Sequence, residues 1–262
     1  MKEPNADEVL AALEAAGTEH PDLSPLLDFR RELLVAERTV AAPPLSLDAA
    51  TVRARLQAGQ PALVLDDLSL DQATFTALLR RVVQVVQQHW PDRPMIGTDL
   101  SLNAVRAWYA GEGGLDQRAA SLIAEALHPF LTQVARAVQP DLDGVEWYRE
   151  YCPACGGGPD FAVLERESGA RYLLCSRCDT RWRYKRLGCP FCGNEDQCKL
   201  AYYPSEDQVY RLYVCDGCRR YLKAIDLRQT NRELLVPLER LLTAGMDLAA
   251  REKDYRSTGV LI

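Results

Sequence analysis

Four Cys-x-x-Cys pairs between residues 152 and 218 constrain this chain more than any other feature. Two residues between cysteines allow a tight turn to aim both sulfurs at one point, and two such turns complete a tetrahedral set of four sulfurs. The spacing therefore predicts two four-thiolate metal sites. The eight expected ligands are Cys152, Cys155, Cys175, Cys178, Cys189, Cys192, Cys215 and Cys218.

The cysteine region is an internal repeat. The Cys-Pro-x-Cys-Gly stretch at 152–156 recurs at 189–193, and hairpin patterns at 161–175 and 200–214 follow the two stretches. Each repeat predicts a knuckle, a hairpin, a second knuckle and a strand. This order favours Cys152/Cys155/Cys175/Cys178 as one site and Cys189/Cys192/Cys215/Cys218 as the other, while interleaved pairing stays open.

The residue after each pair indicates how regular each knuckle is. Gly156 and Gly193 suit a left-handed position after the second cysteine, from which backbone N–H groups can donate to sulfur. Asp179 and Arg219 stand there in the other two knuckles, and Arg tolerates that conformation less well than Asp. We therefore expect the fourth knuckle to be the least regular.

Four sulfur ligands suit zinc, or a single iron of the rubredoxin kind, better than a bridged iron–sulfur cluster at this spacing. Zinc is the default for a structural site, and iron would add one-electron chemistry. With all four positions filled, no position is left for a substrate. Metal binding would also supply folding free energy to the region.

The nine cysteines are an odd number, and the first residues carry no signal-peptide core, so a disulfide framework is not expected. No apolar run reaches the roughly 20 residues needed to cross a bilayer. We expect a cytoplasmic protein without membrane insertion. Cys198, the ninth cysteine, is expected to be a small, partly buried thiol, with a substitute ligand or a redox-active thiol as the alternatives.

Before Gly144 the chain has no cysteine and its periodicity is helical. Apolar residues recur at helical spacing after Asp71, the expected N-cap, as far as Pro91. A second pattern runs from Leu115 to about Val138, where Pro129 should kink or divide the helix. Shorter helices are expected at 6–16, 23–39, 48–58 and 99–110, with breaks at 41–44 and 91–94 and a final helix at 236–251.

These patterns predict an α+β protein: an all-helical N-terminal bundle, two tandem rubredoxin-like or zinc-ribbon knuckle units and a C-terminal helix. The expected domains are a helical domain at 1–144, a first four-cysteine unit at 145–187, and a second four-cysteine unit with the C-terminal helix at 188–262.

Other candidate sites are weaker. His20, His89 and His128 lie outside the cysteine region, and we find no catalytic triad, Walker loop, dinucleotide fingerprint or HExxH motif, so we expect no enzyme. The basic stretch 177–186, interleaved with Trp182 and Tyr184, would suit an acidic protein, a nucleic acid or simply a solvated face. Nucleic acid is the less favoured partner, because the net charge is −6 and the pI about 5.3.

The order of these features resembles a known family. The two Cys-Pro-x-Cys-Gly knuckles, the Trp-containing strand that follows Cys175 and Cys178, Tyr221–Asp226 and Asp247–Arg256 together are similar to the formate dehydrogenase accessory protein family, FdhE. The resemblance is specific over about 145–256 and looser through the helical half, where the short N-terminal region departs from the family.

That resemblance implies a cytoplasmic, rubredoxin-like accessory protein that acts on the catalytic subunit of formate dehydrogenase before export. It carries the family's four cysteine pairs onto the eight cysteines named above and implies iron as the metal. The leading hypothesis is an assembly factor. An electron-transfer protein with rubredoxin-like iron is the second hypothesis, and a zinc-ribbon nucleic-acid binder is the third.

Overall fold

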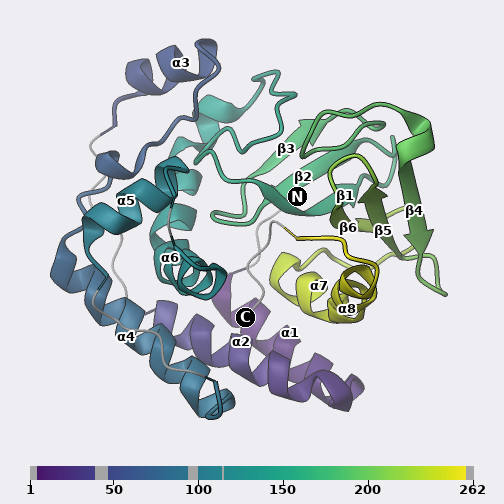
Figure 1. Cartoon of the computed structure of the whole chain (residues 1–262), viewed down its shortest axis with the longest axis horizontal. Helices are drawn as coiled ribbons and strands as arrows, with labels where there is room; N and C mark the ends of the chain where they lie inside the picture. Colours follow the sequence, from purple (N-terminus) through teal and green to yellow (C-terminus); the bar gives the residue numbers. More distant parts are fainter. Residues whose placement is uncertain (1–4, 39–46, 94–99, 114, 258–262) are drawn as a thin grey trace. The chain divides into compact units, whose positions relative to one another are not determined.

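The structure is a computed structural model that describes residues 5–38, 47–93, 100–113 and 115–257 (Figure 1). It confirms the α+β class, with helices before residue 144 and a six-stranded sheet after it. The chain divides into two compact units. The first contains the described residues up to Asp48 together with Leu63–Val134, and the second contains Ala49–Ala62 and the described residues from Ala135 onward. The boundaries expected at residues 144 and 187 stay predictions.

The first unit is helical, and its elements match the helices predicted at 6–16, 23–39, 72–90, 99–110 and 115–138. The breaks expected at 41–44 and at Pro94 lie outside the described residues. The elements are α1 (Ala6–Glu19), α2 (Ser24–Glu37), α4 (Gln72–His89), α5 (Leu102–Ala110), the first part of α6 (Gln117–Leu142), and the 3-10 turns η1 (Pro21–Leu23) and η2 (Leu65–Asp67).

Helix α4 begins and ends where its sequence predicts. The Asp71 carboxylate accepts the Thr74 hydroxyl at 2.6 Å and the Thr74 backbone N–H at 2.8 Å, and these hydrogen bonds lower the pKa of Asp71. The apolar stripe, Phe75 and Leu79 included, is buried. Trp90 caps the C-terminus, and its ring lies edge-on to Phe29 of α2 at 4.7 Å between centroids.

Of the two effects expected of Pro129, a kink or a division of the helix, division does not occur in α6. The helix is continuous over 26 residues, from Gln117 to Leu142. Proline removes one backbone hydrogen bond, but Leu127, Phe130 and Leu131 on the adjoining turns are at most 1% exposed. Their burial offsets the lost bond. Among the described residues, no helix combines the length and the hydropathy that a bilayer span requires.

The second unit is built on one sheet with strand order β3-β2-β1-β6-β5-β4 (Figure 1). Its two hairpins and the strand after each second knuckle confirm the predicted repeat. The strands are β1 (Pro159–Leu164), β2 (Arg171–Cys175), β3 (Arg181–Tyr184), β4 (Leu200–Pro204), β5 (Tyr210–Cys215) and β6 (Arg220–Asp226), and the 3-10 turn η3 (Gln197–Lys199) precedes β4.

The two cysteine repeats share this sheet. Strand β1 of the first repeat pairs in parallel with β6 of the second, Phe161 opposite Lys223 and Leu164 opposite Asp226, while the other neighbouring strands pair antiparallel. The central strands β1 and β6 are therefore almost entirely buried. The sequence repeat predicts two similar units but does not predict that they join edge to edge.

The C-terminal segment forms two helices where the sequence predicts one: α7 (Val236–Leu242) and α8 (Ala244–Glu252). The break falls at Thr243, whose hydroxyl donates to the carbonyls of Glu239 and Arg240 at 2.8 and 3.1 Å. Such bonding competes with the regular helical pattern. Met246 and Leu242 pack against the sheet core around Phe161, so both helices cover the sheet.

Helix α3 (Ala49–Gln57) also belongs to the second unit. The loop after it is bonded to the first knuckle: the Ala62 N–H donates to the Pro153 carbonyl at 2.8 Å, and the Tyr151 hydroxyl donates to the Gly59 carbonyl at 2.7 Å. Residues far before the cysteine region thus help to position the first knuckle.

Candidate metal centres

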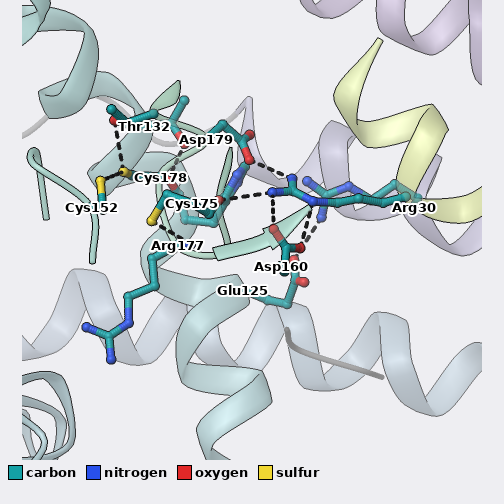
Figure 2. Close-up of polar contacts among 12 residues, drawn as sticks. Arg30, Glu125, Thr132, Cys152, Asp160, Cys175, Arg177, Cys178 and Asp179 are labelled. Atoms are coloured by element: carbon teal, nitrogen blue, oxygen red, sulfur yellow. Dashed lines mark hydrogen bonds and ion pairs between the residues drawn. The ribbon is translucent and has the colours of Figure 1, made fainter. Parts of the chain in front are cut away.

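The sulfurs of Cys152, Cys155, Cys175 and Cys178 all lie within 4.8 Å of one another, and all four residues are buried. The Cys152 and Cys178 sulfurs are 3.6 Å apart (Figure 2). Those of Cys155 and Cys175 are 3.4 Å apart. A tetrahedron with metal–sulfur bonds of about 2.3 Å has edges of about 3.8 Å. This first cysteine group can therefore hold one metal ion after only small movements.

The second cysteine group consists of Cys189, Cys192, Cys215 and Cys218, whose sulfurs also lie within 4.8 Å of one another. The Cys189–Cys218 and Cys192–Cys215 sulfur distances are 3.6 and 3.9 Å. Cys192 is exposed and Cys218 is half-buried, so this group is the more open to solvent. The structure thus brings the cysteines together in sequence order and not in the interleaved arrangement.

All four knuckles share one backbone conformation. The residue after the second cysteine has a positive φ in each of them: 72° at Gly156, 59° at Asp179, 67° at Gly193 and 56° at Arg219. Its N–H donates back to the carbonyl of the first cysteine at 2.8–3.3 Å. The expectation of a less regular fourth knuckle is wrong for the backbone.

Contacts of the side chain hold Arg219 in this left-handed conformation. Its guanidinium donates to Asp216 at 2.9 Å and to the carbonyl of Lys253, and lies 4.1 Å from the centre of the Tyr255 ring. A non-glycine residue in this region pays a conformational cost of about 1–2 kcal/mol. These three contacts offset that cost, and the two to Lys253 and Tyr255 near the end of the chain are not visible in the local sequence.

The first cysteine group disfavours several thiolates at once. Burial raises the pKa of Cys152 and of Cys178 well above the ordinary thiol value. Burial acts in the same direction on Cys175, but contacts with the other three sulfurs and with the Arg177 N–H, at 3.3 Å, bring its pKa well below that value. One sulfur therefore ionises readily, while the full set needs a cation to offset its charge.

The second group shows the same division. Burial raises the pKa of Cys189, and it raises the pKa of Cys218 to about 11. The pKa of Cys215 is lowered, because the N–H groups of Cys218 and Gly217 donate to its sulfur and outweigh burial. In both groups the first cysteine of the second knuckle thus has a lowered pKa.

An arginine from α7 braces the first group. The Arg240 guanidinium pairs with Asp160 of β1 at 2.7 Å and with Asp179 of the second knuckle at 2.6 Å, and it donates to the Cys175 carbonyl at 2.9 Å. Figure 2 shows Asp160 and Asp179 beside Cys175 and Cys178. The C-terminal helix is therefore tied directly to the backbone that carries two of the sulfurs.

A second buried ion pair fastens the same helices to the sheet. The Lys223 ammonium of β6 lies 2.6 Å from the Asp247 carboxylate of α8 and donates to the Arg240 carbonyl at 3.0 Å. Asp247 also accepts from the Tyr221 hydroxyl at 2.8 Å. Arg240, Asp160, Lys223 and Asp247 were not predicted as part of the site, because the residues that meet lie 17 or more positions apart in the chain.

Residues outside the two groups do not join them. Cys198 is exposed, so the expectation of a partly buried thiol is wrong, and it belongs to neither group. His89 lies 3.3 Å from Glu32, and His128 lies 3.4 Å from Glu37, both in the helical unit. Within the described residues, the two cysteine groups are the only sets placed to hold a metal ion.

The basic stretch at 177–186 does not present aromatic rings to a nucleic acid. Trp182 and Tyr184 are 4% and 2% exposed. The Trp182 indole donates to the Arg149 carbonyl at 3.0 Å, and the Tyr184 hydroxyl donates to Glu150 at 3.2 Å. Bases could stack on these rings only if the rings left the core. The structure therefore argues against nucleic-acid binding through aromatic residues of this stretch.

Four sulfurs without nitrogen or oxygen donors fit zinc or a single iron ion, and they leave no position for a substrate. The fold and this donor set define the class of the protein: an α+β chain with paired four-cysteine knuckle sites on one sheet. The family described as "FdhE, central domain" matches residues 151–186, which include the first cysteine group. The chain is therefore similar to the FdhE family in the segment that carries its first cysteine group.

Relatives extend this match beyond the central domain. "Protein FdhE homolog" of Aquifex aeolicus (strain VF5) is 28% identical over 251 residues, 90% of this chain and 87% of that protein. The homolog of Pseudomonas aeruginosa is 33% identical over 126 residues, 44% of this chain and 40% of that protein. The alignment thus reaches less than half of the second relative.

The fold has a counterpart among solved structures. The crystal structure of the FdhE protein from Pseudomonas aeruginosa is similar with a TM-score of 0.67, and the match covers 99% of this chain and 98% of that chain. The sequence identity is 24%, so this likeness supports the fold alone.

Proposed function

We propose that this chain is an accessory factor for formate dehydrogenase, which binds the catalytic subunit in the cytoplasm before export and is not itself an enzyme. One observation carries the proposal: two four-sulfur groups share one sheet in a chain that is similar to FdhE proteins. The resemblance of the cysteine region to the formate dehydrogenase accessory proteins supplies the client.

The metal sites are part of this proposal. Each cysteine group would hold one ion through all of its four sulfurs, Cys152/Cys155/Cys175/Cys178 in the first and Cys189/Cys192/Cys215/Cys218 in the second. The resemblance favours iron, and the donor set also accepts zinc. Either ion would offset the charge of thiolates that burial otherwise disfavours, and it would thereby stabilise the knuckles.

A deletion strain and a pull-down test the accessory role. Formate dehydrogenase activity should be lost without this chain, and the catalytic subunit should copurify with it in reducing buffer. Cys152→Ser and Cys189→Ser should each lower the metal content by one ion per chain and weaken copurification. Cys198→Ser is the matched control, because this exposed thiol lies outside both groups, and it should match the wild type in both measurements. Full activity in the deletion strain together with no copurification would remove the proposal.

One observation favours electron transfer as a second candidate function. Cys192 brings one sulfur of the second group to the surface, where a redox partner could approach a bound iron. Anaerobic purification with metal quantification and a visible spectrum separates the two functions. A bleachable iron–thiolate spectrum assigned to the second group would support electron transfer. Zinc in both groups after expression with ample iron would exclude it.

A further inference from the structure

A cavity of about 430 Å³ adjoins the second cysteine group, and Cys189 and Cys215 form part of its wall. Volumes of this size are typical of sites that hold a small molecule or one to two side chains. The cavity lies within the second unit, between the loop after β3, the third knuckle and the strands β4 and β5. Apolar and aromatic side chains, including Phe191, make up most of the wall.

The charged residues of this wall are all arginines. Arg171, Arg186 and Arg220 line the cavity, and no aspartate or glutamate among the described residues does so. Arg171 is 3% exposed and donates to the carbonyls of Lys185 and Gly188 at 2.6 and 2.8 Å. Its buried Nε has no hydrogen-bond partner in the part of the chain that is described. The wall therefore carries a buried positive charge on Arg171, which donates hydrogen bonds to backbone carbonyls and has no carboxylate beside it within the described part of the cavity wall.

The metal centre would use part of this charge. Four thiolates around a divalent ion carry a net charge of about −2, which Arg171 and Arg220 would offset. Arg220 lies 4.8 Å from the centre of the Phe191 ring, so its guanidinium is held at the wall. Arg186 is a third charge. It is exposed, and among the described residues it forms no ion pair. This remaining cation favours an anionic group at the mouth of the cavity.

The rim of the cavity is apolar although it faces solvent. Leu187 is 65% exposed and Tyr202 is 51% exposed, and both line the cavity. Exposed large apolar side chains grouped around a cavity are typical of protein interaction sites. A small organic acid could fill the cavity but would leave these two side chains in water. A polypeptide could fill the cavity and cover the rim as well.

The edge of the sheet offers backbone contacts to such a polypeptide. Strand β4 is the last strand in the sheet order and contributes Leu200, Ala201 and Tyr202 to the cavity wall. An edge strand leaves one row of N–H and C=O groups without a strand partner, which an extended peptide can use.

We propose that this cavity binds an extended segment of the client protein in which a large apolar side chain lies next to a carboxylate. The apolar side chain would enter between Phe191 and Tyr202, and the carboxylate would lie at Arg186. This inference rests on the proposed accessory function and names the chemistry by which the client is recognised.

Two substitutions in the full-length chain test the cavity. Arg186→Glu reverses the charge at the mouth, and Ala201→Trp places a bulky ring across it on an exposed strand that accepts aromatic residues. Arg183→Glu is the matched control, because Arg183 is an exposed arginine of β3 that does not line the cavity. Metal content is measured for every variant, so that damage to the second cysteine group is recognised.

The readout is affinity for the purified catalytic subunit, and for an array of overlapping peptides that spans it. We expect Arg186→Glu and Ala201→Trp to weaken subunit binding at least about fivefold, and Arg183→Glu to leave it within about twofold. Peptides that bind should contain an acidic residue beside a large apolar one. They should lose binding when the acidic residue is replaced by its amide, Asp by Asn or Glu by Gln.

The outcomes separate the two proposals. Wild-type chain that does not bind the subunit in any of these assays contradicts the accessory function. If the wild-type chain binds the subunit, and Arg186→Glu and Ala201→Trp bind it equally well with unchanged metal content, only the cavity proposal is refuted. Binding of peptides that carry no carboxylate refutes it also.

Discussion

Arg240 provides the sharpest test of how the first cysteine group is held. Its guanidinium bridges Asp160 and Asp179 and donates to the Cys175 carbonyl, so Arg240→Met should leave two neighbouring carboxylates without a counter-charge. Breaking a buried ion pair costs about 3–5 kcal/mol. The Arg240 and Asp179 side chains are 20% and 24% exposed, so solvent screens part of the interaction. We therefore expect the free energy of unfolding to fall by about 2–3 kcal/mol.

The same substitution should loosen metal binding at the first group only. A loss of about 2 kcal/mol from the state that binds metal corresponds to about thirtyfold weaker affinity. We would load the protein with zinc, add a chromogenic chelator and follow release, which should occur in two phases. Arg240→Met should accelerate one phase and leave the other, from the second group, unchanged.

Two controls make this result interpretable. Arg251→Met removes an exposed arginine of α8 and should change neither urea unfolding nor metal release. Arg240→Lys keeps the charge but cannot reach three acceptors with one planar group, so it should restore less than half of the lost stability. If the free energy of unfolding of Arg240→Met is within about 1 kcal/mol of the wild-type value, and both ions are released at wild-type rates, Arg240 does not brace the first group as proposed.

Three further results follow from the cysteine groups. Burial raises the pKa values of Cys152 and Cys178, so protons compete with metal for these sulfurs. The metal affinity of the first group, measured by competition titration, should therefore fall by about tenfold or more per pH unit between pH 8 and pH 6. A metal affinity that does not change with pH would contradict this. Because Cys192 is exposed, a chelator should remove metal from the second group before the first. The order is measured in the wild type and in Cys198→Ser, and earlier release from the first group in both proteins would contradict it. Gly156→Ala, at a φ of 72° and with its new Cβ within 3.0 Å of a proline ring, should cost about 1–2 kcal/mol in urea unfolding, whereas Gly245→Ala in α8 should be neutral or stabilising; equal effects would contradict the strain argument.

Much of the geometry of the cysteine groups could be predicted from local sequence. Each Cys-x-x-Cys pair determines its own turn, since the two sulfurs converge within four residues whatever surrounds them. Gly156 and Gly193 mark the left-handed position, and the backbone at Asp179 and Arg219 follows the same geometry. The helix that starts at Asp71 was equally predictable, because its cap and its apolar stripe are properties of neighbouring residues.

Contacts that the sequence patterns do not weigh, some local and some between distant residues, escaped prediction. Pro129 leaves α6 undivided because packing on the adjoining turns outweighs one lost hydrogen bond, and Thr243 divides the last helix because its hydroxyl finds two carbonyls. The cavity beside the second group was also invisible, since Arg171 and Arg220 reach it from separate strands.

The sequence by itself determined the eight cysteines and their knuckles, and it favoured grouping in sequence order, because short hairpins bring consecutive knuckles together; the structure decided against interleaved pairing. Only the tertiary structure decided that β1 and β6 join both repeats into one sheet, and that Arg240 clamps the first group from a helix at the end of the chain. The physical reason is range. Turn geometry acts within a few residues, whereas strand pairing and buried ion pairs depend on which residues folding brings together.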